Sequence, residues 1–334
     1  MAAYTTIDDP EAYFRIKTYT GDGSTPSITL DGDTDMQPDV VWIKNRDASG
    51  DSHCFFDSVR GATKEMHVEL EAAETTDADT LTSFDSDGFA LGADVQVNTN
   101  TEKYVAWCWK ESATAGFDIV QFTGAGAGTV SHSLSAVPHV YIVKCKDASK
   151  PWSVYHHKNT AAPETDKLSL HATDATYDSN AYWNDTAPTS SVFSVGHTAD
   201  VSADGNVFMT YLWRSVQGFS SMGSYIGNGN ADGTFVYTGF RPAWVIIKRT
   251  DSTTGADWII MDNKRNTYNP VKGRLRSNLD SDEDSPVDFC DFLSNGLKMR
   301  DSSTTTNTSG GTYVYMAFAE APFVNSNGVP CNAR

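Results

Sequence analysis

The segment Pro38-Asp-Val-Val-Trp-Ile-Lys44 decides how the chain is interpreted, because two similar segments follow it. They are Pro138-His-Val-Tyr-Ile-Val-Lys144 and Pro242-Ala-Trp-Val-Ile-Ile-Lys248. Each contains a run of β-branched and aromatic residues that is short for a buried helix and normal in length for a strand. The same strand-like segment therefore occurs three times in 334 residues.

Other landmarks recur in the same order around each of these segments. Glycine turns begin at Gly21, Gly124 and Gly227, which are spaced by 103 residues. Each copy ends in a second apolar segment, at 104–109, 208–213 and 313–318. Landmarks in a constant order and at a nearly constant spacing predict that the chain consists of three copies of one unit.

The pattern inside each copy predicts an all-β fold. In the first closing segment both alternating sets of side chains are apolar: Val105, Trp107 and Trp109 on one face, and Tyr104, Ala106 and Cys108 on the other. A strand of this kind is covered on both sides, as in a β-sandwich. A short helix is expected only within 63–73. We therefore expect three tandem antiparallel β-sandwich (jelly-roll-like) domains from an internal repeat of about 103 residues.

The landmarks divide the chain into an N-terminal arm (1–12), three β-sandwich repeats (13–115, 116–217 and 218–323) and a C-terminal tail (324–334). We expect the arm to pack against a neighbouring subunit or to be disordered. The copies diverge most at roughly 64–86, 160–190 and 264–290. These stretches are expected to be long loops through which a repeated scaffold presents different surfaces.

The charge of the chain excludes several classes of partner. There are 25 Lys and Arg residues and 43 Asp and Glu residues, which give a formal net charge of −18. Because Lys and Arg are needed to displace counterions from phosphates, we expect no nucleic-acid partner. The excess of acid argues against an anionic membrane surface, and strand-sized apolar runs argue against membrane insertion.

The five cysteines predict neither a disulfide framework nor a zinc site, because their number is odd and no two form a CxxC pair. Four of them, Cys54, Cys108, Cys145 and Cys290, lie in or beside apolar runs, where we expect small buried residues. Cys331 lies in the polar tail and is expected to be exposed. We expect no cofactor and no bound metal.

Three further motifs suggest ligand chemistry but have simpler explanations. The acidic run 31–35 lacks the Gly and Glu positions of an EF-hand, and 280–284 is expected to be a solvated acidic loop rather than a Ca²⁺ site. His156 and His157 have the chemistry of a metal pair or a general base. Partly buried histidines at a strand edge are the preferred interpretation.

The repeated Lys44, Lys144 and Lys248 have two interpretations: they contact a repeated ligand, or they mark where a buried strand emerges into solvent. We prefer the second. For catalysis the chain offers no HExxH, GxSxG or P-loop motif. We therefore predict that the protein is not an enzyme.

The aromatic residues offer the best candidate for a binding site. Eight Trp and 14 Tyr residues exceed what three small cores require. Trp183 lies in a polar stretch of the second copy, and an exposed Tyr-Trp pair flanked by Asn and Asp is suited to stack on a sugar and bond its hydroxyls. We predict a glycan-binding loop consisting of Tyr182, Trp183, Asn184 and Asp185. The alternative is that the pair caps the sandwich or meets another subunit.

Several motifs together resemble a domain of tailed phages. They include Tyr19-Thr-Gly-Asp-Gly23, Met36-Gln-Pro-Asp-Val-Val-Trp-Ile-Lys44, Asp57-Ser-Val-Arg-Gly-Ala-Thr63, Tyr237-Thr-Gly-Phe-Arg-Pro242 and Met316-Ala-Phe-Ala-Glu-Ala-Pro322. These are similar to an uncharacterised repeat domain of structural and tail-fibre-like proteins of tailed phages, especially marine ones. The resemblance covers nearly the whole chain and implies a virion component, but it supplies no catalytic residues.

The leading hypothesis is therefore a phage virion protein of the adhesin type, a tail fibre or tip subunit that binds a host cell-surface glycan through its loops. A homo-oligomer is expected, with a trimer favoured, because several weak contacts then act together. One alternative is a capsid decoration or tail structural protein that binds only other virion proteins. Its three copies would then offer pseudo-threefold geometry to a symmetric platform. A second alternative is a polysaccharide depolymerase. The expected location is the virion, at the tail fibre or tip or else on the head surface.

Overall fold

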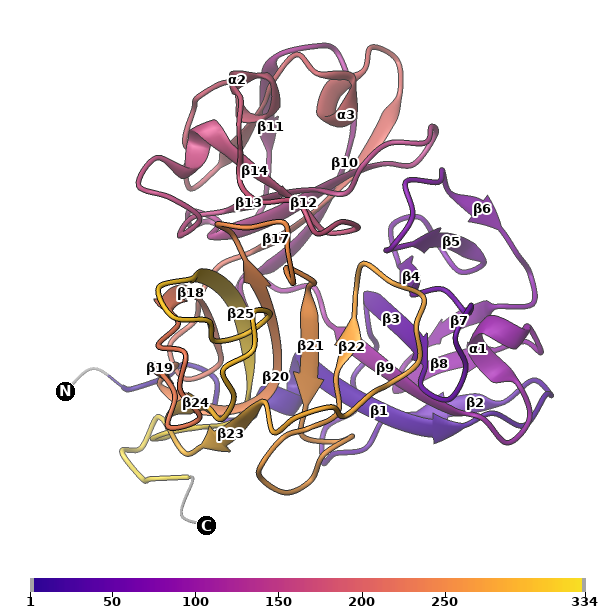
Figure 1. Cartoon of the computed structure of the whole chain (residues 1–334). Helices are drawn as coiled ribbons and strands as arrows, with labels where there is room; N and C mark the ends of the chain where they lie inside the picture. The colour runs from indigo at the N-terminus through magenta and orange to yellow at the C-terminus, as the bar shows by residue number, and fades with distance from the viewer. Residues whose placement is uncertain (1–2, 332–334) are drawn as a thin grey trace.

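The computed structural model describes residues 3–331 and consists almost entirely of strands and turns. Three large antiparallel sheets, each accompanied by a smaller sheet, form three lobes around a common centre (Figure 1). The described helices are single turns: α1 (Val95–Asn98), α2 (Asn180–Trp183), α3 (Ala199–Ser202) and the 3-10 turns η1 (Pro10–Ala12) and η2 (Pro163–Thr165). The prediction of an all-β, antiparallel fold is confirmed.

The three large sheets share one strand order. Sheet 1 contains β1 (Phe14–Thr20), β9 (Lys103–Trp109), β3 (Val40–Asn45), β4 (Cys54–Asp57), β5 (Lys64–His67) and β6 (Thr75–Thr76). Sheet 2 contains β10 (Phe117–Thr123), β17 (Val207–Trp213), β12 (Val140–Cys145), β13 (Ser153–His156), β14 (Asp166–Ser169) and β15 (Tyr177–Asp178). Sheet 3 contains β18 (Ser220–Ile226), β25 (Thr312–Pro322), β20 (Phe240–Arg249), β21 (Ile259–Asp262) and β22 (Leu275–Arg276).

A smaller sheet covers the outer face of each large sheet. The first contains β2 (Ser27–Thr29), β8 (Gly88–Leu91) and β7 (Leu81–Asp85). The second contains β11 (Gly128–Ser131) and β16 (Val192–Val195), and the third contains β19 (Phe235–Tyr237), β24 (Gly296–Met299) and β23 (Cys290–Leu293). Each pair of sheets falls within one of the expected repeats, whose exact boundaries stay a prediction.

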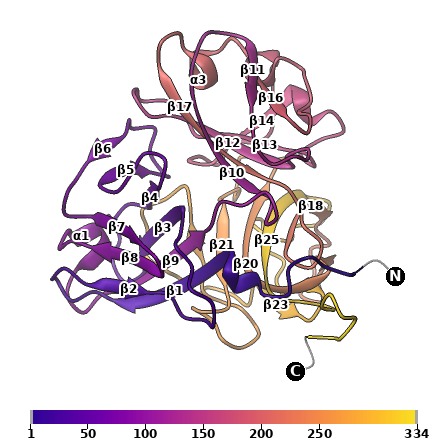
Figure 2. The ribbon, with the colours of Figure 1, turned by 180° about the vertical axis from the view of Figure 1, so that it is seen from behind.

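Both faces of each large sheet are buried, and they belong to different cores. On β9 the Tyr104, Ala106 and Cys108 side chains pack outward against the small sheet, whereas Val105, Trp107 and Trp109 face a core shared by all three large sheets. The expectation that this strand is covered on both sides is therefore confirmed. Figure 2 shows the same three lobes meeting at this centre from behind.

The shared core explains the excess of tryptophan. Seven of the eight Trp residues belong to it: Trp42, Trp107, Trp109, Trp152, Trp213, Trp244 and Trp258. Neighbouring rings from different sheets meet edge to face, with centroids 5.6 Å apart for Trp109 and Trp244 and 6.4 Å apart for Trp109 and Trp213. Edge-to-face contact is a favoured geometry of aromatic pairs. The three repeats therefore have a fourth core in addition to their own three.

Side-chain ring N–H groups of each large sheet donate hydrogen bonds to backbone carbonyls of the next sheet. Three matched positions, each one residue before the fourth strand of its sheet, hold His53, Trp152 and Trp258. His53 Nε2 donates to the carbonyl of Arg276 (2.9 Å), Trp152 Nε1 to that of His67 (3.0 Å), and Trp258 Nε1 to that of Ser169 (2.7 Å). Sheet 1 thus binds sheet 3, sheet 2 binds sheet 1, and sheet 3 binds sheet 2, which closes a ring.

The repeated lysines follow the same cyclic order. Lys44, Lys144 and Lys248 are fully buried, and their ammonium groups donate to the carbonyls of Asp280 (3.2 Å), Glu71 (2.8 Å) and Thr173 (3.3 Å) in the neighbouring repeat. Burial lowers the pKa of all three, to about 8 for Lys144 and about 7 for Lys248. The expectation that these lysines emerge into solvent is wrong, because each caps backbone carbonyls inside the protein.

The carbonyls that the lysines bind lie in the stretches where the repeats diverge. Those stretches were expected to be loops that present different surfaces. Residues 71, 173 and 280 instead lie against the next repeat. Part of the divergence therefore reflects three different contacts between sheets rather than three exposed surfaces.

Two further expectations about local structure are corrected. Residues 63–73 form no helix; they contain β5, which pairs with β4 in sheet 1. The described part of the N-terminal arm packs on its own chain: Ile7 is buried in the shared core, and Tyr4 Oη donates to the carbonyl of Gly239 (2.8 Å). Residues 1–2 of the arm and 332–334 of the tail lie outside the described residues.

The cysteines are placed as predicted, with Cys54, Cys108, Cys145 and Cys290 buried and Cys331 exposed. Among the helices of residues 3–331, none has the length and apolar character needed to cross a bilayer.

Removing one bond between sheets tests whether these contacts stabilise the fold. Tyr211 Oη donates to the Asp57 carboxylate (2.6 Å) between sheets 2 and 1, and both residues are fully buried. We expect Tyr211→Phe to lower the free energy of unfolding by about 1.5–3 kcal/mol, the usual range for a buried hydrogen bond to a charged group. The measurement is denaturant unfolding at equilibrium.

Tyr141→Phe is the matched control. The Tyr141 hydroxyl is equally buried but has no hydrogen-bond partner among the described residues. Its removal should leave stability unchanged or slightly raised. Equal losses in the two variants would contradict a stabilising role for the bond to Asp57.

Candidate functional site

The loop predicted to bind glycan does not expose its tryptophan. Trp183 ends the single helical turn α2 and is fully buried, and its Nε1 donates to the carbonyl of Asp166 (2.9 Å). Its ring meets that of Tyr141 edge to face in the outer core of sheet 2. Burying about 200 Å² of aromatic surface at ~25 cal/mol/Å² stabilises the fold by about 5 kcal/mol. The prediction of an exposed Tyr-Trp pair is wrong; Asn184 and Asp185 alone are exposed in this set.

Tyr182 supports a shallow polar depression instead of forming a platform for a sugar. Its hydroxyl donates to Asp200 (2.9 Å), and the Lys167 ammonium lies 4.8 Å from its ring centroid. The depression next to it measures about 290 Å³. Two of its charged groups, Lys150 Nζ and Asp200 Oδ1, lie 3.9 Å apart, and His171 Nε2 donates to Glu71 Oε1 (3.2 Å). Burial, and after it the bond to Asp200, raises the pKa of Tyr182.

A different aromatic residue is the most exposed large one among those described. Tyr268, in one of the divergent stretches, has 85% of its surface exposed. The amide of Asn269 beside it is engaged with the backbone of Phe292, at 2.9 Å for both of its hydrogen bonds. The Asn269 amide is therefore not free to bond a sugar hydroxyl beside this ring.

Basic side chains pair with some of the carboxylates in the two acidic runs. Glu283 binds Arg46 of sheet 1 (2.7 Å) and Arg265 (3.2 Å), and Asp284 binds Arg274 and Arg276 at 2.6 Å each. The expectation of a solvated loop at 280–284 holds only in part, because Asp280 and Asp282 are exposed whereas Glu283 and Asp284 are held in ion pairs. In the run 31–35, Asp31 pairs with Lys17 at 2.7 Å. The arginine pairs fill the carboxylates of 283–284 that a Ca²⁺ ion would need.

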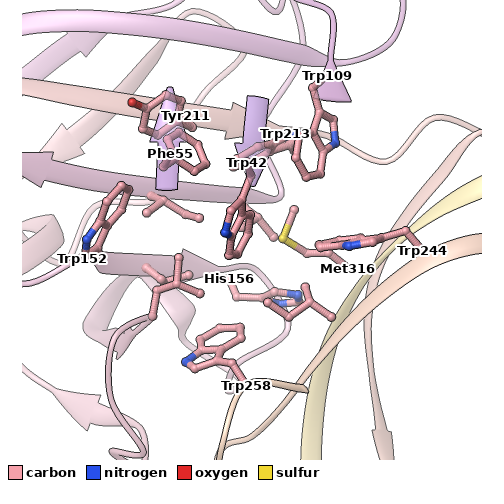
Figure 3. A pocket seen from close by; sticks show the side chains of 15 residues that line it. Trp42, Phe55, Trp109, Trp152, His156, Tyr211, Trp213, Trp244, Trp258 and Met316 are labelled. Atoms are coloured by element: carbon pink, nitrogen blue, oxygen red, sulfur yellow. The ribbon is translucent and has the colours of Figure 1, made fainter. Parts of the chain in front are cut away.

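The shared core contains a cavity, but the cavity is too small for a ligand. Figure 3 shows the Trp, Tyr and Phe side chains of the three sheets pointing into it. Its volume is about 30 Å³ and its lining is apolar. A space of this size holds at most about one water, and an apolar one stays dry. It is a packing defect of the core rather than a binding site.

The His156–His157 pair is structural. His156 is buried; its Nε2 donates to the carbonyl of Tyr315 in sheet 3 (3.1 Å), and its Nδ1 accepts from the backbone N–H of Lys158 (3.1 Å). The His157 ring stacks on His139 with centroids 4.1 Å apart. Because both nitrogens of His156 are used, this residue can serve neither as a metal ligand nor as a general base.

The pKa values of all three histidines are lowered. Burial, followed by the charge of His157, lowers the pKa of both His156 and His139, to about 3 and about 4 respectively. Burial also lowers the pKa of His157. All three side chains are therefore neutral in the folded protein at neutral pH.

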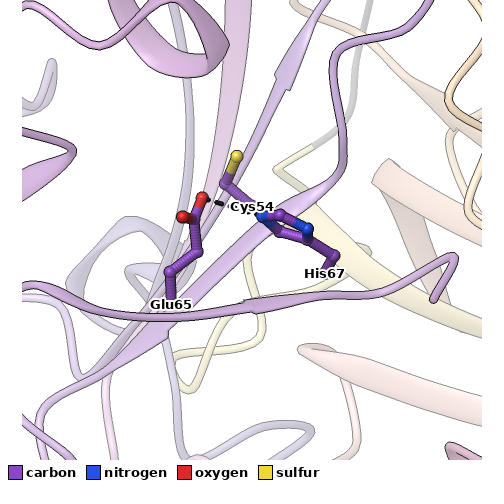
Figure 4. A group of neighbouring side chains, drawn as sticks. All are labelled: Cys54, Glu65 and His67. Carbon is purple, nitrogen blue, oxygen red and sulfur yellow. Dashed lines mark ion pairs between the residues drawn. The ribbon is translucent and has the colours of Figure 1, made fainter. Parts of the chain in front are cut away.

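One cluster in sheet 1 combines the side chains of a metal site. Strand pairing places Cys54 on β4 directly opposite His67 on β5, and Glu65 lies two residues before His67 on the same face. One ligand atom of each side chain lies within 4.8 Å of the other two, and 3.3 Å separates Glu65 Oε1 from His67 Nε2 (Figure 4). The cluster was not expected from the sequence, because a helix over 63–73 would put residues 65 and 67 on different faces.

The cluster lies in an interior environment. Cys54 and Glu65 are buried and His67 is partly exposed. Burial, and after it the charge of Glu65, raises the pKa of Cys54 well above its usual value, so the thiol is protonated. Burial lowers the pKa of His67, but hydrogen bonding and attraction to Glu65 outweigh this effect and leave it raised.

The histidine pKa values predict that acid destabilises the protein. The folded state binds fewer protons than the unfolded state, so the contribution of His156 is complete above pH 6.5 and is lost as the pH falls toward about 3. Between pH 7.5 and 5 we expect His156 alone to account for a loss of about 2 kcal/mol. Denaturant unfolding at a series of pH values measures this loss.

His156→Gln is the comparison variant, because its amide can donate to the Tyr315 carbonyl without titrating. Its stability should fall less steeply than that of the wild type over the same pH range. Parallel curves for the two proteins would show that His156 does not cause the acid sensitivity.

A family model matches residues 9–322 of the chain and is described as a domain of unknown function, DUF7483. No curated protein matches the sequence. The matched region begins beside η1 and ends with β25, so a single family domain contains all three large sheets. The chain belongs to the DUF7483 family.

Proposed function

We propose that this protein is a structural component of a tailed-phage particle and binds other proteins of that particle. The resemblance of its repeat motifs to phage structural proteins supports this role. The observation that carries the proposal is the ring of contacts between sheets, in which every large sheet binds the backbone of the next. A closed ring of contacts fixes the three lobes in one relative arrangement, and a structural component of a particle needs such a fixed shape.

The outer faces of the lobes favour a scaffold with several different neighbours. The small sheets have three, two and three strands, although the large sheets beneath them share one order. A frame with approximate threefold geometry can sit on a symmetric platform while its lobes contact unlike proteins. This geometry favours a capsid decoration or tail structural protein.

Host recognition has less support than this structural role. The hypothesis of an adhesin-like tail fibre depended on an exposed Tyr182–Trp183 pair, and Trp183 is fully buried. Receptor binding and trimer formation therefore stay predictions without an assigned residue. Depolymerase activity likewise stays a prediction without an assigned pair of catalytic carboxylates.

Locating the protein on the particle tests the proposed function. An antibody raised against the purified chain should label intact particles of the phage that encodes it at one fixed position, by electron microscopy with gold-conjugated secondary antibody. Mass spectrometry of the same particles should give a constant number of copies per particle. Particles that lack the protein while infected cells contain it would contradict a structural role.

A further inference from the structure

The Cys54, Glu65 and His67 side chains bring sulfur, oxygen and nitrogen ligand atoms to one point on sheet 1. We propose that they bind a zinc ion. Cys54 comes from β4, while Glu65 and His67 come from the same face of the adjacent strand β5. Because all three belong to paired strands, the ladder between β4 and β5 fixes their relative positions. This proposal is independent of the role in a phage particle.

The spacing of the ligand atoms suits tetrahedral zinc. With Zn–S near 2.3 Å and Zn–N and Zn–O near 2.0–2.2 Å, tetrahedral ligand atoms lie about 3.4–3.6 Å from one another. The 3.3 Å between Glu65 Oε1 and His67 Nε2 is already close to that spacing. Since the Cys54 sulfur lies within 4.8 Å of both other ligands, it needs to move by only about 1 Å.

The polar atoms of the cluster have few other partners. Glu65 Oε1 and His67 Nε2 are buried and face each other at 3.3 Å, and neither atom has another hydrogen-bond partner in the part of the chain that the structure describes. The Cys54 thiol makes long contacts, at 3.6 Å to the carbonyl of Ser52 and 3.8 Å to Gln96 Oε1, and it also interacts with Glu65. Glu65 is 97% buried, and a carboxylate in such a place is normally fully bonded. A bound cation would complete these bonds.

Carboxylates outnumber ammonium groups around the cluster, although the buried ammonium of Lys44 also acts on Cys54. The carboxylates of Glu65, Glu69 and Asp94 all act on Cys54. Thiolate and imidazole select zinc over Mg²⁺ or Ca²⁺, which prefer oxygen ligands alone. Binding would release the thiol proton of Cys54, and water or Gln96 Oε1 would supply the fourth ligand. The partly exposed edge of His67 gives the ion a route from solvent.

The matched positions of the other two sheets lack this set of ligands. The strand registers place Ser153, Lys167 and Ser169 there in sheet 2, and Ile259, Arg274 and Arg276 in sheet 3. Basic side chains thus stand where sheet 1 has Glu65. The proposed site therefore belongs to sheet 1 alone, and one zinc ion per chain is expected.

Zinc titration of the full-length protein tests the proposal. The starting protein carries Cys331→Ser, which removes the exposed thiol. A chelator first removes any bound metal. The protein is then titrated with zinc chloride in a calorimeter, and its zinc content is measured by elemental analysis. One zinc ion per chain should bind and raise the melting temperature. Cys54→Ser and His67→Gln should each weaken binding on the order of 100-fold or more, and Glu65→Gln should weaken it while keeping the side-chain shape.

Cys108→Ser is the matched control, because Cys108 is buried in the same outer core but lies outside the cluster. It should bind zinc like the starting protein. Cobalt provides a second readout: a thiolate-to-cobalt absorption band should appear in the starting protein and the control and be missing from Cys54→Ser. If Cys54→Ser does not fold, the zinc affinities of Glu65→Gln and His67→Gln test the proposal instead. A folded starting protein that binds no zinc, or equal zinc binding by all variants, would overturn the proposal.

Discussion

Hydrogen bonds from buried side chains to backbone carbonyls of the neighbouring sheet hold the three large sheets in place around one aromatic core. Lys44, Lys144 and Lys248 lose hydration on burial, which is why their pKa values are lowered. Left without carbonyl partners, such groups would destabilise the fold by several kcal/mol each. The three buried ammonium groups therefore find their carbonyl partners only when the sheets are arranged as observed. Because the contacts run from each sheet to the next and close a ring, they fix the relative positions of all three lobes.

The sequence predicted which strand faces are apolar but not what covers them. Alternation in 104–109 indicated a strand buried on both sides, and the two sets of side chains do lie in two cores. The number of Trp residues also exceeded what separate domains need. Neither signal says that three inward faces meet each other, because an apolar face has the same pattern whether it packs on its own domain or on a neighbour.

The local errors have physical causes as well. Lysine at the end of an apolar run usually reaches water, and no pattern reveals a carbonyl supplied from 73 to 236 residues away. Trp183 lies in a polar stretch, yet one helical turn directs its ring inward. The Cys54–Glu65–His67 cluster depends on strand pairing, so an expected helix concealed it. In each case a long-range contact decided the position of the side chain.

Calorimetry of the full-length protein tests most directly whether the three lobes form one unit. With a shared core and cyclic contacts, heating should produce one cooperative transition whose calorimetric and van't Hoff enthalpies agree. Independent sandwich domains would instead give two or three separable transitions, or a calorimetric enthalpy well above the van't Hoff value. That second result would contradict a single closed assembly of the three sheets.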